Sequence, residues 1–144
     1  LVLVGGLNGG IGLVDVDAVS LELLERVPGV PTAGAFSPDG SRIAVLSAST
    51  SANAPSGVQL IDVATGQRIG VPMRPYGTEA FGTGVSWADD GSGIWVSTDD
   101  GPVRFAADLA GWREIACGVV HRELTPDEWR QFVSDTDPQV SSCA

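Results

Sequence analysis

Lysine is absent from this 144-residue sequence, and all eight basic residues are arginines. They stand against 18 acidic residues, which gives a formal net charge of −10 at pH 7. Binding to nucleic acids or to anionic membrane surfaces depends on clustered Lys and Arg side chains that neutralise phosphate charge. The sequence contains no such cluster, so we expect no nucleic acid and no membrane surface among its partners.

Long apolar runs are also missing. The longest uninterrupted stretches are a few residues, far below the roughly 20 that a membrane-spanning helix requires. The first four residues, 1–4, read LVLV and resemble the inside of a strand. They include no initiator Met and no basic region of the kind that begins a signal peptide. We therefore expect this sequence to be the C-terminal piece of a longer protein.

Residue patterns for catalysis or metal binding are scarce as well. The single histidine, His121, lacks further ligands at zinc-site spacing, and no Gly-x-Ser-x-Gly elbow occurs. Two Asp-x-Asp pairs, at 15–17 and 135–137, lack the other ligands of a calcium loop. The Asp-Asp pairs at 89–90 and 99–100 suit turns. The sequence therefore predicts no catalytic residue, no metal site and no cofactor.

The most informative feature that is present is a strand-turn-strand unit that occurs twice. Residues 34–45 read GAFSPDGSRIAV, and residues 85–96 read VSWADDGSGIWV. The interval between the turn glycines, Gly40 and Gly91, is 51 residues. Repeats of this length that are built from short strands are typical of propeller blades.

The strand pattern predicts part of one blade, a complete blade and part of a third. An ordinary β-sandwich made of hairpins is the alternative, although a sandwich does not need matched repeats. We expect Val45, Ile61, Val63 and Trp95 to be buried between the sheets. The ten predicted strands are, in chain order, 1–5, 12–16, 21–27, 33–37, 43–47, 58–63, 67–71, 85–87, 94–97 and 102–106.

Loop length predicts which end of the complete blade binds a partner. Antiparallel strands alternate in direction, so a blade's second loop and its connection to the next blade emerge at the same end. Both are long here, at 48–56 and 72–82, and long loops on a rigid scaffold often bind partners. The alternative for each loop is a tolerated polar insertion. The candidate contact residues in these loops are Asn53, Arg74, Tyr76 and Phe81.

The C-terminal part of the sequence has a helical pattern. In the run Thr125-Pro126-Asp127-Glu128, threonine is an N-cap, proline suits the first helical position, and glutamate completes a capping box. Trp129 and Phe132 then share one helical face, and the same spacing begins upstream at Trp112. These patterns predict two short helices over 112–133 that pack Trp112, Trp129 and Phe132 against the last blade.

Two cysteines, Cys117 and Cys143, are 26 positions apart and flank the second predicted helix. A disulfide between them would close the helical tail and add about 3–4 kcal/mol of stability in the chain-entropy model. Two independent thiols are the alternative, which a cytosolic location would favour. The sequence leaves both open.

These segments resemble the C-terminal part of actinobacterial WD40-repeat proteins. The resemblance implies a propeller joined to a signalling NTPase, a transcription-factor domain or a protein kinase, with the tail closing the propeller. The Gly-His and Trp-Asp pairs of typical WD40 blades are absent, so their usual buried hydrogen-bond network is not implied. The segments that resemble the family are 36–40 (FSPDG), 60–66 (LIDVATG), Trp112, 116–117 (AC), 122–129 (RELTPDEW) and Cys143.

Together these observations predict a mainly β fold. Residues 1–110 form about two and a half WD40-like four-stranded antiparallel blades of a partial β-propeller, and residues 111–144 form a short α-helical tail. We expect a non-catalytic scaffold that binds a protein partner or the upstream domains of its own chain. A ligand-binding or hydrolytic propeller enzyme and a purely structural role are the alternatives. The isolated fragment is expected to self-associate through the unpaired edge at 1–5.

Overall fold

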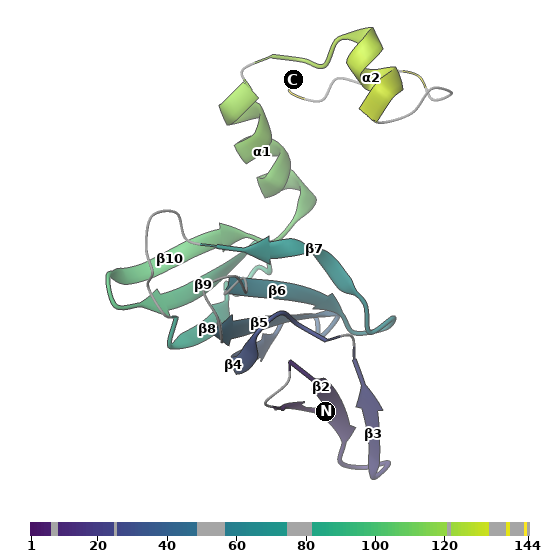
Figure 1. The fold of residues 1–144 in the computed structure, drawn as a ribbon, viewed down its shortest axis with the longest axis vertical. Coiled ribbons are helices and arrows are strands. Elements are labelled where there is room, and N and C mark those ends of the chain that lie inside the picture. Colours follow the sequence, from purple (N-terminus) through teal and green to yellow (C-terminus); the bar gives the residue numbers. More distant parts are fainter. Residues whose placement is uncertain are drawn as a thin grey trace. The chain divides into compact units, whose positions relative to one another are not determined.

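The computed structural model describes the chain except for residues 7–8, 25, 49–56, 75–81, 121, 133–137, 139–142 and 144, and except for the side chains of Val120 and Phe132. The fold is mainly β, with antiparallel sheets of three or four strands and two short helices, which confirms the predicted fold class (Figure 1). The chain divides into two compact units, Leu1–Phe105 and Ala106–Ala144. The second unit begins shortly before the predicted boundary at residue 110.

The described strands follow the predicted order closely. They are β1 (Val2–Gly5), β2 (Ile11–Asp15), β3 (Ser20–Leu23), β4 (Val30–Phe36), β5 (Arg42–Ala48), β6 (Gly57–Asp62), β7 (Arg68–Met73), β8 (Gly84–Trp87), β9 (Gly93–Thr98) and β10 (Gly101–Ala106). The third strand ends four residues earlier than predicted. The chain turns inward there, and the backbone N–H groups of Leu24 and Val27 donate to the carbonyls of Ile11 and Gly9.

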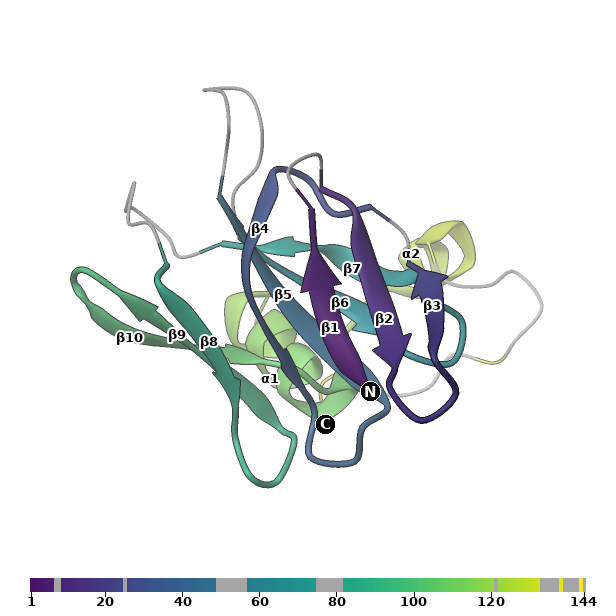
Figure 2. The ribbon, with the colours of Figure 1, turned by 90° about the horizontal axis from the view of Figure 1, so that it is seen from below.

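The strands form three antiparallel sheets. The first has the order β1-β2-β3, the second β4-β5-β6-β7, and the third β10-β9-β8. The four-stranded sheet lies between the other two: β1 contacts β4 on one side, and β8 contacts β4 and β5 on the other (Figure 2). This is the predicted arrangement of one complete blade flanked by two partial ones.

The two repeated turns have the same hydrogen bonds. In the first, Ser37 N–H donates to the Arg42 carbonyl, and in the second Ala88 N–H donates to the Gly93 carbonyl. The turn glycines, Gly40 and Gly91, both have φ near +71°, a conformation that residues with a Cβ rarely adopt. The sequence repeat is therefore also a structural repeat.

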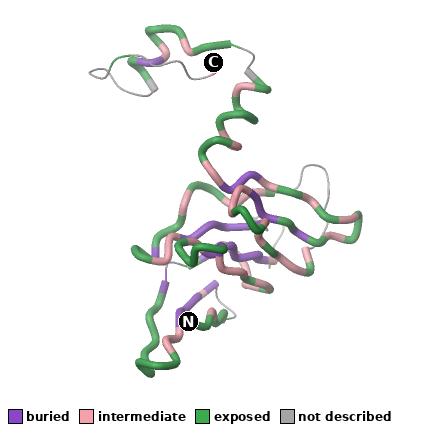
Figure 3. The backbone as a smooth tube through the Cα atoms, turned by 180° about the vertical axis from the view of Figure 1, so that it is seen from behind, coloured by how far each residue is buried: buried purple, intermediate pink, exposed green. Residues whose placement is uncertain are grey.

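One core lies between the first and second sheets. It contains seven buried apolar side chains, and the buried segments are concentrated in the central strands (Figure 3). Gly34 allows β4 to approach β1 closely, because a Cβ there would lie 2.2 Å from Leu3 Cδ2. The core residues are Ile11, Leu13, Leu24, Val27, Ile43, Val45 and Ile61.

The opposite face of the second sheet packs toward the third. The register places Ala44 opposite Leu60 and Leu46 opposite Val58, so these four side chains share one face. All four are buried, as are Ile94 and Val96 of β9. A Cβ on Gly82 would meet both Leu46 and Val96 at 2.9 Å, which confirms that the two sheets approach each other there.

Three of the four predicted core residues are buried or partly buried. Val45 and Ile61 are fully buried, and Val63 is partly buried and packs against the core. The prediction for Trp95 was wrong, because its side chain is 41% exposed. Trp95 is paired with Ser86 on the face of the third sheet that points away from the second.

The second unit contains the two predicted helices, α1 (Leu109–Val120) and α2 (Pro126–Phe132). Asp108 caps α1 by accepting a hydrogen bond of 2.7 Å from Gly111 N–H. The indole N–H of Trp112 donates to the Ala106 carbonyl at 2.8 Å and fixes the first turn of α1. No helix in the described part of the chain is long and apolar enough to cross a membrane.

Candidate interaction surface

The bases of the two long loops lie together at one end of the second sheet. Ser47 pairs with Gly57, and Val58 pairs with Met73, so β5 ends, β6 begins and β7 ends at the same side. A Cβ on Gly57 would lie 2.4 Å from the Met73 carbonyl oxygen and 3.2 Å from Arg74 Cγ. We call this side, defined by Ala48, Gly57 and Met73, the loop end.

Among the predicted contact residues in the loops, the structure describes Arg74. Its side chain is exposed and lies directly beside Gly57, at the loop end. Asn53, Tyr76 and Phe81 lie outside the described residues. The role of Arg74 as a partner contact therefore stays a prediction.

The third sheet continues the loop end. Thr83 N–H donates to the Ser97 carbonyl at 2.8 Å, and Gly84 pairs with Ser97, so β8 begins at the same side. The β9–β10 turn also lies there, with Thr98 Oγ1 donating to the Gly101 carbonyl at 2.6 Å. The described ends of the connection between these sheets therefore lie at this end, Arg74 beside the second sheet and Thr83 on the third.

The opposite end carries tight turns whose carboxylates accept several hydrogen bonds. We call this side, defined by residues 37–41, 64–67 and 88–92, the turn end. Asp39 accepts from Ser37 Oγ at 2.6 Å and from Ser41 N–H at 3.0 Å. The hydrogen bond from Ser37, followed by those from Ser41, lowers the pKa of Asp39 from 3.8 to about 2.

The same arrangement recurs in the other turns. Asp90 accepts from Ser92 Oγ and N–H, and Asp62 accepts from Thr65 N–H and Oγ1. These bonds lower the pKa values of both carboxyls, and the N–H of Ala18 does the same for Asp15 in the first sheet. The lowered pKa of each of these carboxyls is therefore caused by hydrogen bonds within its own turn. The described residues contain no group of acidic, histidine or cysteine side chains that could hold a metal ion.

In the helical unit, Glu128 is the centre of a hydrogen-bonded cap. It accepts hydrogen bonds from the two terminal nitrogens of Arg122, Nη2 at 2.6 Å and Nη1 at 2.7 Å, and from the N–H of Thr125 at 2.8 Å. The Arg122 hydrogen bonds, followed by those from Thr125, lower the pKa of Glu128 to about 2. Glu128 N–H donates in return to Thr125 Oγ1, so the predicted capping box is present.

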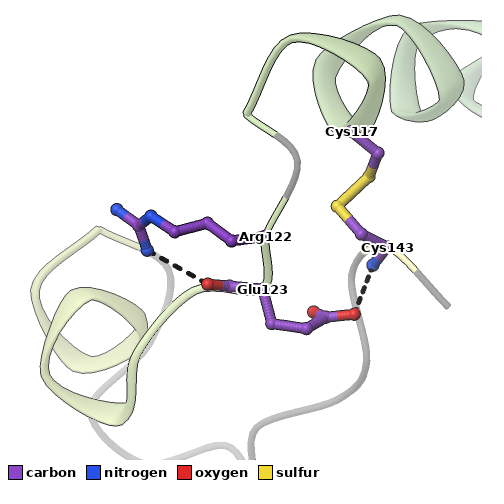
Figure 4. A pocket seen from close by; sticks show the side chains of 4 residues that line it. All are labelled: Cys117, Arg122, Glu123 and Cys143. Carbon is purple, nitrogen blue, oxygen red and sulfur yellow. Dashed lines mark hydrogen bonds between the residues drawn. A yellow bond between two sulfur atoms is a disulfide. The ribbon is translucent and has the colours of Figure 1, made fainter.

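The two cysteines are bonded to each other, with Cα atoms 5.4 Å apart. They line a hollow of about 330 Å³ together with Arg122 and Glu123 (Figure 4). Glu123 Oε1 accepts a hydrogen bond from the N–H of Cys143 at 2.8 Å. Trp129 is buried in this unit, Trp112 is half-buried, and the Phe132 side chain and His121 lie outside the described residues.

Sequence reasoning missed the polar contacts between the second and third sheets. The indole N–H of Trp87 donates to the Ala35 carbonyl at 2.9 Å, and the Arg42 guanidinium lies over the Trp87 ring, 5.0 Å from its centroid. Arg104 donates to Ser92 Oγ at 2.8 Å on the third sheet. The aromatic residues of the repeat were visible in the sequence, but no local pattern indicated these partners.

Neither a protein-family model nor a curated protein matches this sequence. Solved structures do match. The C-terminal WD40 domain of Sif2 is 16% identical, with a TM-score of 0.54 over 74% of this chain and 30% of that chain. A functionally unknown protein from Desulfotomaculum acetoxidans DSM 771 is also 16% identical, with a TM-score of 0.56 over 76% of this chain and 34% of that one.

This likeness establishes the fold. The three stacked antiparallel sheets are a WD40-like part of a β-propeller, as the repeats predicted. The chain spans about one third of the length of these two solved chains.

Proposed function

We propose that the chain is a segment of a WD40-like β-propeller that works as a non-catalytic protein-interaction scaffold within a larger regulatory protein. The WD40-like fold supports the scaffold role, because a propeller presents its loops on a rigid frame. The resemblance of the FSPDG, LIDVATG and tail segments supports an origin in an actinobacterial signalling NTPase, kinase or transcription regulator.

The observation that supports the position of the binding surface is that the described residues at the bases of the two long connections lie side by side at the loop end. Gly57 begins β6 after the first long loop, and Arg74 follows β7 and lies beside Gly57. The Arg74 side chain is exposed. The turn end offers a contrast, because Asp39, Asp62 and Asp90 there accept hydrogen bonds from serine and threonine side chains. A partner that approaches the loop end can therefore contact the exposed side chain of Arg74.

The proposed partner is a protein, or an upstream domain of the same polypeptide. Arg74, Tyr76 and Phe81 are the proposed anchors, with Asn53 as a further polar contact. Arginine and aromatic side chains are enriched at the centres of protein interfaces. The net charge of −10 favours a partner with a basic or neutral contact surface over an acidic one.

The helical unit has a structural role in this proposal. Residues 1–110 belong to the propeller, and residues 111–144 shield an exposed edge or end of the last blade with the apolar faces of the two helices. Leu109, Ile115 and Val119 are exposed on α1, and covering them on a sheet would remove that apolar surface from water. The disulfide then ties the end of the tail to α1.

A photo-crosslinking experiment tests the proposed surface. A benzophenone amino acid replaces Arg74 at the loop end in the full-length protein, and Ser41 at the turn end provides the matched control. The proposal predicts a discrete crosslinked partner or domain from position 74 and none from position 41. Equal crosslinking from both positions, or crosslinking from position 41 alone, would contradict it.

A further inference from the structure

Three groups make the polar contact between the second and third sheets: an indole, a carbonyl and a guanidinium. The repeat gives the equivalent position of each group on the third sheet. Trp87 of β8 donates its indole N–H to the Ala35 carbonyl of β4 at 2.9 Å. Its ring lies under the guanidinium of Arg42, which belongs to β5. The second sheet thus contacts the Trp87 indole through two groups, a carbonyl acceptor on β4 and the guanidinium of Arg42 on β5.

The 51-residue offset identifies the corresponding positions on the third sheet. Because the two turns share their hydrogen bonds and glycine conformations, Ala35 corresponds to Ser86 and Arg42 corresponds to Gly93. Ser86 lies on the face that points away from the second sheet, where it pairs with Trp95. Without another residue, this face would lack the cation that Arg42 supplies.

Arg104 supplies a guanidinium at that place from the neighbouring strand, β10. A Cβ on Gly93 would lie 2.7 Å from Arg104 Cζ, Nε and Nη2, so the guanidinium occupies the volume of a side chain at position 93. It is held there by its hydrogen bond to Ser92 Oγ. The third sheet therefore carries a guanidinium beside the position equivalent to Arg42, although the sequence repeat has lost the arginine.

The rest of this outward face is exposed and differs from its counterpart on the second sheet. Trp95 stands in place of the buried Ala44, and Ser97 stands in place of the buried Leu46. Side chains at Ser86, Trp95, Ser97 and Arg104 are all exposed. A docked sheet would complement this face by placing a small residue opposite the Trp95 ring and an aromatic ring opposite the Arg104 guanidinium.

We propose that the outward face of β8–β10 is a docking site for a further propeller sheet that presents a tryptophan in the manner of Trp87. Arg104 lies over its ring, and the Ser86 carbonyl accepts its indole N–H. Trp95 requires a small residue on that sheet. This inference depends on the proposed propeller segment, and it adds the residue chemistry by which the next sheet is recognised.

The test uses the complete 144-residue chain and a synthetic peptide of residues 82–92, which contains the Trp87 strand and its turn. The peptide is titrated against the ¹⁵N-labelled chain, and the Arg104 Nε–H resonance is followed by NMR. A docked indole shifts this resonance through its ring current. The same peptide with Trp87→Ala has the same charge and is expected to leave the resonance unshifted.

Three chain variants complete the test. Arg104→Gln is expected to weaken peptide binding about tenfold, whereas Arg26→Gln, which removes a charge elsewhere, leaves binding unchanged. In the double variant G93R/R104Q the guanidinium returns from position 93, as in Arg42, and binding recovers. Absence of peptide binding at millimolar concentration, or equal binding by the chain with and without Arg104, would overturn the proposal. Neither result bears on the loop end, which the crosslinking experiment tests separately.

Discussion

At the scale of single residues, hydrogen bonds hold the carboxylates of Asp39 in its turn and of Glu128 at the start of α2. Asp39 and Glu128 each accept several hydrogen bonds, and both have pKa values near 2. Hydrogen bonds to the charged form favour that form, so each group resists protonation in the folded protein.

The Asp39 pKa gives a pH-dependent prediction. The folded pKa, about 2, lies below the ordinary value of 3.8, so the stabilisation is complete above 3.8 and is lost as pH falls toward 2. Ser37→Ala removes the strongest hydrogen bond and is expected to move the pKa toward 3.8. A ¹³C titration of the Asp39 carboxyl measures both values, with Ser86→Ala as the matched control. Titration of wild-type Asp39 near 3.8 would show that the turn does not hold the carboxylate in this way.

A second prediction at this scale compares neighbouring residues of α2. Trp129 is buried, whereas Arg130 is exposed and pairs with Asp127. Trp129→Ala is expected to reduce the free energy of unfolding by about 2–3 kcal/mol. Arg130→Ala should cost less than about 1 kcal/mol, because an exposed ion pair contributes little. Chemical unfolding monitored by circular dichroism compares them, and equal costs would be inconsistent with a buried Trp129.

At the scale of elements, local hydrogen bonds stabilise the start of each helix in the helical unit. Asp108 and Trp112 fix the start of α1, and Thr125 with Glu128 caps α2. The disulfide connects α1 to the end of the chain across 26 positions. Short helices are marginal alone, so these contacts are needed to keep the unit ordered.

Loss of the disulfide is therefore expected to destabilise the helical unit. In the chain-entropy model, closing a loop of this length contributes about 3–4 kcal/mol. Reductant, or the double substitution Cys117→Ser and Cys143→Ser, should lower the melting temperature of the helical signal. Reductant added to the double variant is the control and should have no further effect. An unchanged melting temperature in the reduced wild-type protein would mean that the bond contributes nothing to stability.

At the scale of the whole molecule, the two outer sheets present different surfaces. On the first sheet, Val2 pairs with Val14 and Val14 with Leu21, while Val4 and Leu23 flank Gly12. These apolar side chains share one face, and Leu21 and Leu23 are 59% and 78% exposed. A contiguous apolar face of this kind usually marks an interaction site.

The apolar face of the first sheet predicts self-association of the isolated chain. Replacing Leu21 and Leu23 by Ser is expected to shift the protein toward the monomer in analytical ultracentrifugation. Val71→Ser is the matched control, because Val71 is also exposed but lies on the second sheet. A wild-type chain that stays monomeric at high concentration would refute the prediction.

The sequence predicted local structure better than it predicted contacts between sheets. Turn chemistry and the 51-residue repeat placed the strands and the stacking of three sheets, because both depend on neighbouring residues. Trp95 was misplaced, since alternation along a strand does not say which face a neighbouring sheet covers. The Arg42–Trp87 contact joins residues 45 positions apart, and Arg104 replaces Arg42 from a different strand. Only three-dimensional proximity reveals such a substitution.

The most direct measurement of the central claim is the affinity of the crosslinked partner for loop-end and turn-end variants. One variant replaces Arg74, Tyr76 and Phe81 by Ala, and its control replaces Ser41, Thr65 and Asp89 at the turn end. If the loop end binds the partner, calorimetry will show that the loop variant binds at least about tenfold more weakly while the control binds like the wild type. Unchanged affinity of the loop variant would contradict the account.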